Sequence, residues 1–356
     1  MKWLLLGLLY PAVSSGQVYG FKSLDASKFK VDEKSQIEIT NLPPLQSQDT
    51  LGICYGVAAS VILTAENCRS MNTDCKTITS DKVFSPLGLS PIGRPAEDKA
   101  PAKKSKNENP DPYGGSIYNT LDQLVLSGEF APSEQCLSLE KILSRVGGSA
   151  EASEVQLGIW KKLKALYEKS KEVPKDCESC LNSFYSTAQK EIQEGLDVDV
   201  SNESMLKAFG KKTYAEFFDR ILISPECRKL SKSVAVEYPS KKDFKFYPLL
   251  GKTGTYNEAI NTIKNVLNDG RPLGLGNICL DEKPSSKKCE NQHGVVVAGY
   301  RKTCDSKGKC VDSVKVLNSW GKSWQDQNAD GWVDAKTLLD RTFYKEATLT
   351  WIADKK

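Results

Sequence analysis

The chain of 356 residues carries a formal net charge of +4 at pH 7, and its charged residues, 26% of the total, are interspersed along the sequence. This distribution excludes the basic stripe that is typical of nucleic-acid-binding proteins. Because the length exceeds the roughly 250–300 residues at which a single hydrophobic core stops growing, we expect more than one lobe or domain.

The first 16 residues have the composition of a secretory signal peptide. Lys2 precedes an apolar run from Trp3 to about Val13, and small residues follow up to Gly16. The run is too short to span a bilayer, so we expect cleavage near Gly16 and a mature protein that is secreted or periplasmic. No later stretch has the roughly 18 uninterrupted apolar residues that a membrane span needs.

The next part of the chain, 17–136, is predicted to form an N-terminal segment and a helical lobe. The stretch "VAASVILTAENC" (57–68) has no helix breaker, which predicts a helix that is buried on several faces and begins at or just before Cys54. The Pro- and Lys-rich segment 93–115 predicts a surface loop in its first part. The stretch "SIYNTLDQLVLSG" then predicts an amphipathic helix that stops at Gly128.

The middle segment, 137–245, has the pattern of several amphipathic helices. Trp160, Leu163 and Tyr167 recur at helical spacing, which favours a core-facing stripe over a partner-binding surface. The last segment, 246–356, starts with a helix that ends at Gly270.

Short β-branched runs follow that helix: "PLGLGNICL", "HGVVVAGY" and "SVKVLNSW". They are bounded by turn-forming or polar residues and are typical of strands. A helical first half with a β-rich last third indicates an α+β protein whose lobes meet at a cleft.

Eleven cysteines leave one unpaired if all the others form disulfides. Sequence neighbours flanking turns predict three short bridges, Cys68 with Cys75, Cys279 with Cys289, and Cys304 with Cys310. Four further cysteines then pair among themselves, namely Cys136, Cys177, Cys180 and Cys227. Cys54 remains, and an odd thiol in an oxidising compartment is either a partner for another chain or a reactive group.

The sequence has a single histidine, His293, at the start of a predicted strand. A lone histidine is more often a surface or a satisfied core residue than a catalytic one, but its surroundings favour chemistry here. The next predicted strand ends at Asn318. A thiol nucleophile needs a base, and the base needs a third group that orients its ring, so Cys54, His293 and Asn318 supply the three parts. The N-terminus of a helix at Cys54 would lower the pKa of its thiol.

Four stretches of this sequence resemble the papain family of cysteine peptidases. They are "QDTLGICYGVAAS" around Cys54, "YGGSIYNTLDQLVLSG", "QHGVVVAGY" around His293, and "NSWGKSWQDQNADGWV" with Asn318, Trp320 and Trp324. The four stretches occur in the order of the family, and they cover only the two ends of the chain.

The resemblance implies a role for each matched residue. Cys54 would be the nucleophile, His293 would form an ion pair with it and protonate the leaving amine, and Asn318 would aim the imidazole ring. Trp320 would shield the His293–Asn318 bond from water, and Gln48 would donate to the oxyanion together with the backbone N–H of Cys54. The backbone at Gly114 and Gly115 would pair with an extended peptide substrate.

The resemblance also implies a papain-like two-lobe fold, and this chain departs from the family pattern in several respects. The separation between Cys54 and His293 exceeds the about 130–150 residues of the family by roughly 90–110 residues. This excess predicts that 137–245 is a helical insertion between the lobes. Thr50 stands where many members have a disulfide cysteine, so that bridge must be absent.

We therefore expect a secreted cysteine endopeptidase that acts through a thioester acyl-enzyme. A papain-fold transpeptidase or amidase is the alternative, and a catalytically silent binding protein is a further one. The expected partners are polypeptide substrates, with peptide inhibitors or regulators binding the helical insertion, and we expect a monomer.

No metal or cofactor is expected. The segment "DQNADG" (326–331) has only the first half of a calcium loop, because Thr337 occupies the position of the bidentate glutamate. Cys177 and Cys180 have the spacing of a zinc or redox pair but lack a second pair, which favours a structural disulfide.

Overall fold

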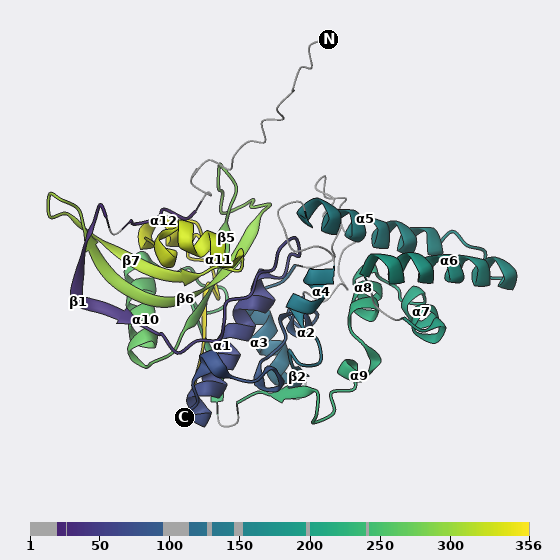
Figure 1. Ribbon diagram of the computed structural model, residues 1–356. Coiled ribbons are helices and arrows are strands. Elements are labelled where there is room, and N and C mark those ends of the chain that lie inside the picture. The colour runs from purple at the N-terminus through teal and green to yellow at the C-terminus, as the bar shows by residue number, and fades with distance from the viewer. Residues whose placement is uncertain are drawn as a thin grey trace, which may run out of the picture.

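A computed structural model of the chain describes residues 20–25, 27–94, 114–126, 130–145, 152–196, 200–239 and 242–355 (Figure 1). The expected signal peptide, 1–16, lies outside the described residues, as do Gly128 and most of the predicted loop 93–115.

The fold combines helices with an antiparallel sheet, as the sequence predicts. Within the described residues the main sheet has seven strands. Their order is β4 (Lys242–Tyr247), β9 (Leu349–Asp354), β5 (Leu273–Cys279), β6 (Gln292–Cys304), β7 (Cys310–Leu317) and β8 (Trp332–Asp334), while β1 (Lys30–Glu38) pairs with β6.

Strand β6 is the centre of this sheet. Its first half pairs with β5 and its second half with β1, while β7 follows its other edge. Val295 and Val297 face one hydrophobic core, and Val296 and Ala298 face another. Burial on both faces explains why the strand is a continuous apolar run rather than an alternating one.

Helices cover both faces of the sheet (Figure 1). Helix α1 (Cys54–Met71) packs against β6, with α2 (Pro86–Leu89) and α3 (Ile117–Leu126) beside it. It has buried side chains on every turn, as expected for a helix enclosed on several sides. The opposite core contains α10 (Tyr256–Asn268), α11 (Gly321–Gln327) and α12 (Ala335–Asp340). Short 3₁₀ turns are η1 (Cys75–Thr77), η2 (Ser80–Lys82) and η3 (Ala329–Gly331).

A third group, which we call the middle helices, lies beside α1 and α2 in Figure 1. It comprises α4 (Leu139–Arg145), α5 (Ala152–Ser170), α6 (Glu178–Leu196), α7 (Asn202–Phe209), α8 (Tyr214–Leu222) and α9 (Pro225–Arg228). Trp160, Leu163 and Tyr167 are in the core of this group, as their spacing predicts. Leu51 and Ile53 belong to the same core, so the middle helices pack directly against the chain that leads into α1.

The chain enters and leaves the middle helices through one small ribbon, in which β2 (Phe130–Pro132) pairs with β3 (Ala235–Glu237). The domain boundary expected between 245 and 246 falls inside β4, which pairs with β9 of the main sheet. Strand β1, which lies in the expected N-terminal segment, likewise pairs within the main sheet. Long-range strand pairing, which local patterns do not encode, accounts for the place of both strands.

Five disulfides link ten of the eleven cysteines: Cys68–Cys75, Cys136–Cys227, Cys177–Cys180, Cys279–Cys289 and Cys304–Cys310. The three short bridges agree with the sequence prediction, and the remaining four cysteines pair among themselves. Cys54 is the free thiol.

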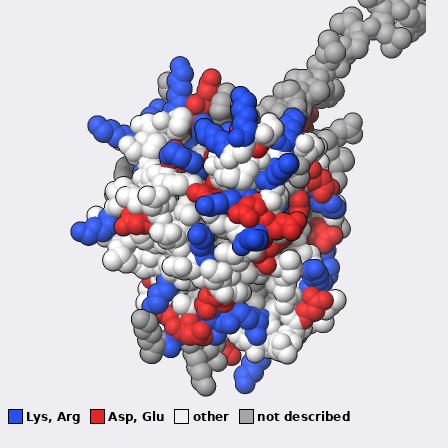
Figure 2. Space-filling view, turned by 90° about the vertical axis from the view of Figure 1, so that its left-hand side faces the viewer, with Lys and Arg blue, Asp and Glu red and all other residues white. Residues whose placement is uncertain are grey.

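Charges of both signs are mixed on the surface. On the face shown in Figure 2, Lys and Arg side chains lie interspersed with Asp and Glu side chains. Among the described residues, the helices are all too short or too polar to cross a membrane.

Candidate active site

Cys54 is the first residue of α1, and its thiol faces strand β6. The N-cap residue Ile53 provides no side-chain hydrogen bond, so the first N–H groups of the helix are left for other acceptors. The backbone N–H groups of Gly294, Tyr55 and Cys54 itself lie near the sulfur and favour the thiolate. Burial has the larger effect and raises the pKa of Cys54 to about 11. Gly294 directly follows His293, so the free thiol lies near the backbone of the strand that carries the histidine.

His293 is buried near the start of β6, opposite Ile278 of β5. Its Nε2 lies 2.8 Å from Oδ1 of Asn318. Because an amide oxygen only accepts, Nε2 carries the proton in this bond and Nδ1 is left as the acceptor. Burial lowers the pKa of His293 to about 4, and the bond to Asn318 opposes that decrease.

Asn318 lies just beyond the end of β7 and is fully buried. Within the described residues, its Nδ2 has no hydrogen-bond partner. Gln325 of α11 lies behind it: its Nε2 donates to the carbonyl oxygen of Val316 at 2.7 Å, and its Oε1 lies 3.5 Å from the backbone nitrogen of Asn318. The side chain of Gln325 therefore holds the backbone on both sides of Leu317, and the side-chain oxygen of Asn318 points at the histidine.

Aromatic rings enclose the His293–Asn318 pair. The ring of Trp320 stacks on the imidazole with centroids 4.6 Å apart and an interplanar angle of 24°. Phe21 packs edge-on against His293, Trp320 and Trp324, at centroid distances of 6.2, 5.7 and 5.3 Å. Trp320 thus covers one face of the imidazole ring. Phe21 was missed, because nothing in its local sequence indicates a contact with the far end of the chain.

Gln48 is buried at the start of the turn that leads to Cys54. Its Nε2 donates to the carbonyl oxygen of Leu51 at 2.7 Å, and its Oε1 accepts a hydrogen bond of 2.5 Å from Oγ of Ser319. Its backbone N–H also donates to the carbonyl oxygen of Ser319 at 2.8 Å. Ser319 follows Asn318, so Gln48 is tied to the same short segment that orients the histidine.

Gly114 and Gly115 differ in their surroundings. A Cβ atom on Gly115 would lie 2.5 Å from the carbonyl oxygen of Gly93 and 2.8 Å from the ring of Tyr55. A Cβ atom on Gly114 would meet nothing within 4 Å. Both residues are exposed, and Gly115 reaches the neighbourhood of Cys54 through the ring of Tyr55.

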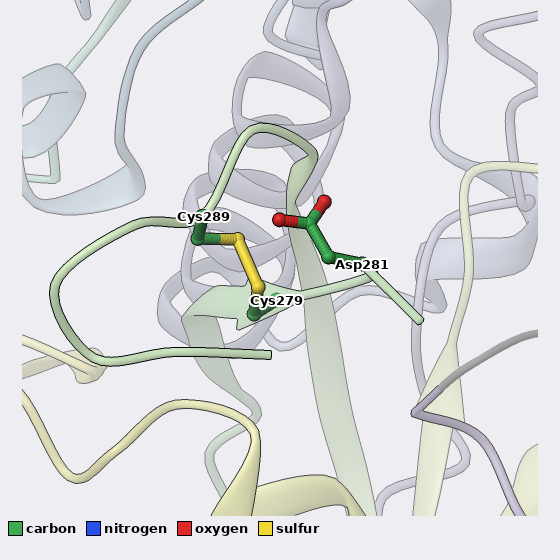
Figure 3. A group of neighbouring side chains, drawn as sticks. All are labelled: Cys279, Asp281 and Cys289. Carbon is green, nitrogen blue, oxygen red and sulfur yellow. A yellow bond between two sulfur atoms is a disulfide. The ribbon is translucent and has the colours of Figure 1, made fainter. Parts of the chain in front are cut away.

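In the described part of the chain, one group of side chains has the spacing of metal ligands: Cys279, Asp281 and Cys289 (Figure 3). The two cysteines form a disulfide, which removes their thiolates as ligands. Oδ1 and Oδ2 of Asp281 accept hydrogen bonds from the backbone of Asn291 and Glu290. The disulfide and the Asp281 carboxylate therefore hold together the two ends of the loop between β5 and β6.

Two carboxylates of the polar turn 326–331 form salt bridges. Asp326 contacts Lys322 at 2.7 Å, and Asp330 contacts Lys315 at 2.5 Å. Both carboxylates of the turn thus pair with lysines in this structure.

The described chain is thus a protein of mixed helices and antiparallel sheet, and two solved structures resemble it at low similarity. The bromelain protease from Ananas comosus in complex with the E64 inhibitor aligns with a TM-score of 0.40 and 10% sequence identity, over 90% of this chain and 98% of the other. PepW from Lactobacillus rhamnosis HN001 aligns with a TM-score of 0.38 and 10% identity, over 93% of this chain and 85% of the other. No protein-family model and no curated protein matches the chain. The chemistry of the site is therefore inferred from its own residues.

Proposed function

We propose that the protein is a cysteine peptidase that hydrolyses peptide bonds, with Cys54 as nucleophile, His293 as base and acid, and Asn318 as the residue that orients the imidazole. The observation that carries the proposal is the position of the sole free thiol at the N-terminus of α1, near the backbone N–H of Gly294, the residue that follows His293. The 2.8 Å bond from His293 to Asn318 supplies the third part. The resemblance of four sequence stretches to the papain family supports the same assignment.

Proton transfer within the pair is the first step. Burial opposes either charge alone, since it raises the pKa of Cys54 and lowers that of His293. Transfer of the thiol proton to Nδ1 of His293 creates both charges together, so their attraction offsets part of the cost of burial. Three backbone N–H groups stabilise the thiolate, and Oδ1 of Asn318 keeps its bond to Nε2 of the imidazolium.

The thiolate then attacks the peptide carbonyl carbon, and the carbonyl oxygen becomes an oxyanion. Collapse of this tetrahedral intermediate breaks the C–N bond, and the imidazolium gives its proton to the departing amine. A water molecule, deprotonated by His293, hydrolyses the thioester and releases the acid and the free thiol.

Gln48 and the backbone N–H of Cys54 are the proposed donors to the oxyanion. One proton of the Gln48 amide is used by the carbonyl of Leu51, and the second is available to a ligand. Such a donor typically contributes 10²- to 10³-fold to the rate, or about 3–4 kcal/mol.

The proposal includes the architecture expected from the sequence. Two lobes meet at the Cys54–His293 site, the middle helices are an insertion between them, and the exposed backbone at Gly114 and Gly115 binds an extended peptide. The five disulfides are compatible with a secreted protein.

The test combines labelling with turnover under mild reductant. An epoxide inhibitor of papain-like enzymes should alkylate Cys54, as located by mass spectrometry, and fluorogenic peptides should be cleaved by the wild-type protein but not by Cys54→Ala. Transfer of the acyl group to an added amine in preference to water would favour the transpeptidase. A thiol that stays unlabelled in the folded protein would overturn the proposal.

A further inference from the structure

The turn between Gln48 and Cys54 is held by helix α5 of the middle helices. Oγ1 of Thr50 donates a hydrogen bond of 2.7 Å to Oε1 of Gln156, and it accepts one of 2.9 Å from Nε1 of Trp160. Nε2 of Gln156 also lies 3.4 Å from Oδ2 of Asp49. Two residues of α5, one helical turn apart, thus hold two consecutive residues of the turn.

The α5 side of these contacts is buried, whereas Thr50 is half-buried and Asp49 is exposed. Trp160 is 0% exposed and Gln156 is 1% exposed, so neither side chain can exchange its protein partner for solvent. A buried donor or acceptor that loses its partner bears the full cost of desolvation, which makes the bonds to Thr50 difficult to break. Leu51 and Ile53, both fully buried, share a hydrophobic core with Trp160 and add apolar contacts on the same side.

The turn transmits the position of Thr50 to Gln48. Nε2 of Gln48 donates to the carbonyl oxygen of Leu51, and the N–H of Leu51 donates to the carbonyl oxygen of Gln48 at 3.0 Å. Thr50 lies between these two residues, next to Asp49, whose φ is 46°. Aspartate tolerates this left-handed conformation better than most residues, and Oδ1 of Asp49 accepts a hydrogen bond of 2.7 Å from Oγ of Ser47. A shift of Thr50 would therefore move the Gln48 amide.

We propose that Gln156 and Trp160 of α5 are positioning residues for the oxyanion site, acting through Thr50 on Gln48. The inference rests on the proposed peptidase function. It gives the middle helices an indirect part in the reaction, through the turn that carries Gln48. It also explains how the turn is held at the position where many papain-family members have a disulfide cysteine and this chain has Thr50.

The experiment separates oxyanion stabilisation from the reactivity of the thiol. Thr50→Val keeps the shape of the side chain and removes the hydroxyl. Two rates are measured on it: kcat for a fluorogenic peptide, which requires an oxyanion, and alkylation of Cys54 by iodoacetamide. Alkylation forms a C–S bond with loss of iodide and passes through no oxyanion, so it reports only on the thiolate and His293.

We expect kcat of Thr50→Val to fall by about 10- to 100-fold, since a misplacement of about 1 Å can cost that much, with KM nearly unchanged. The alkylation rate should stay within about twofold of the wild-type rate. Thr50→Ser, which restores the hydroxyl, should recover most of kcat. Trp160→Phe removes the indole N–H that donates to Thr50, together with part of a buried ring system. Its kcat should also fall with the alkylation rate unchanged, and it serves if Thr50→Val does not fold.

The matched control is Tyr167→Phe. It removes a hydrogen bond of 2.7 Å from the same helix to the carbonyl oxygen of Lys212, away from the turn. Its kcat should equal that of the wild type.

Three results would overturn the inference. An unchanged kcat in both Thr50→Val and Trp160→Phe would remove the positioning role. Equal losses of hydrolysis and alkylation would mean that Thr50 supports Cys54 or the fold as a whole. A wild-type protein that is alkylated at Cys54 but cleaves no peptide would reject the peptidase function itself, before any variant is compared.

Discussion

Ser319 and Gln48 are joined by two hydrogen bonds, although 271 positions separate them in the sequence. The hydroxyl of Ser319 donates to the side-chain oxygen of Gln48, and the backbone N–H of Gln48 donates to the carbonyl oxygen of Ser319. Asn318, which binds His293, is the preceding residue. The proposed oxyanion donor and the proposed orienting residue are thus fixed to the same piece of backbone.

The first prediction concerns this connection. Ser319→Ala removes the donor to Oε1 of Gln48 and frees the amide to rotate, so kcat for peptide hydrolysis should fall by roughly 10-fold. The control is Ser313→Ala: this buried hydroxyl of β7 has no hydrogen-bond partner in the described structure, and its removal should leave kcat unchanged. Equal activities of the two variants would contradict the role of Ser319.

The second prediction concerns the stability of the protein in acid. The pKa of His293 is about 4 in the folded protein and about 6.5 for an exposed histidine, so the unfolded chain takes up this proton first as the pH falls. The free energy of unfolding should therefore decrease between pH 6.5 and pH 4, by up to about 3 kcal/mol from this group. Above pH 6.5 the group should have no effect.

Urea unfolding at pH 7 and at pH 4.5 checks this, with His293→Gln as the reference. Acidic groups titrate in both proteins, and only the wild type has the buried imidazole. The wild type should lose more stability than the variant between the two pH values. Equal decreases in the free energy of unfolding of the two proteins would show that His293 is not protected from protonation.

The third prediction compares two adjacent glycines. Gly115→Ala would push a methyl group against the carbonyl oxygen of Gly93 and the ring of Tyr55, the neighbour of Cys54. We expect it to destabilise the protein by about 1–3 kcal/mol and to lower kcat. Gly114→Ala meets no atom within 4 Å and should leave the melting temperature unchanged. Calorimetry of both variants measures their stability. A larger decrease in melting temperature for Gly114→Ala than for Gly115→Ala would contradict the packing described.

The fourth prediction concerns the disulfide between Cys136 and Cys227, whose partners are 91 positions apart. It encloses the middle helices, so its loss as a double alanine variant should destabilise them by about 4–5 kcal/mol on the loop-entropy account. The Cys177–Cys180 bridge, with a separation of 3, should contribute only about 2 kcal/mol. Thermal unfolding of the two double variants gives the comparison, and a reversed order would mean that loop closure is not the main contribution.

Local patterns were sufficient for much of this structure. The helix that begins at Cys54 and the apolar run of β6 have a strong periodicity or a continuous apolar character, and the structure contains both. An odd number of cysteines predicts one free thiol, and the expected pairing of the other ten leaves Cys54, which is the free thiol in the structure. The link between His293 and Asn318 was suggested by the resemblance and by the types of residue, and the two side chains are within hydrogen-bonding distance.

Other features depend on contacts between distant parts of the chain, which no local pattern encodes. Phe21 against the ring of His293, Ser319 against Gln48, and Trp160 against Thr50 are of this kind. Thr50 was recognised only as a departure from the family pattern. Its partners became evident only when α5 was seen to pack beside the turn.

During synthesis on the ribosome, strand β1 is made long before its partner strand β6. Lys30 pairs with Cys304, so at about 5–20 residues per second the strand leaves the ribosome tens of seconds before its partner β6 exists. An unpaired apolar strand tends to pair with strands of other nascent chains. The sequence of β1, "KVDEKSQIE", is largely charged or polar, and this composition protects it until the rest of the sheet arrives.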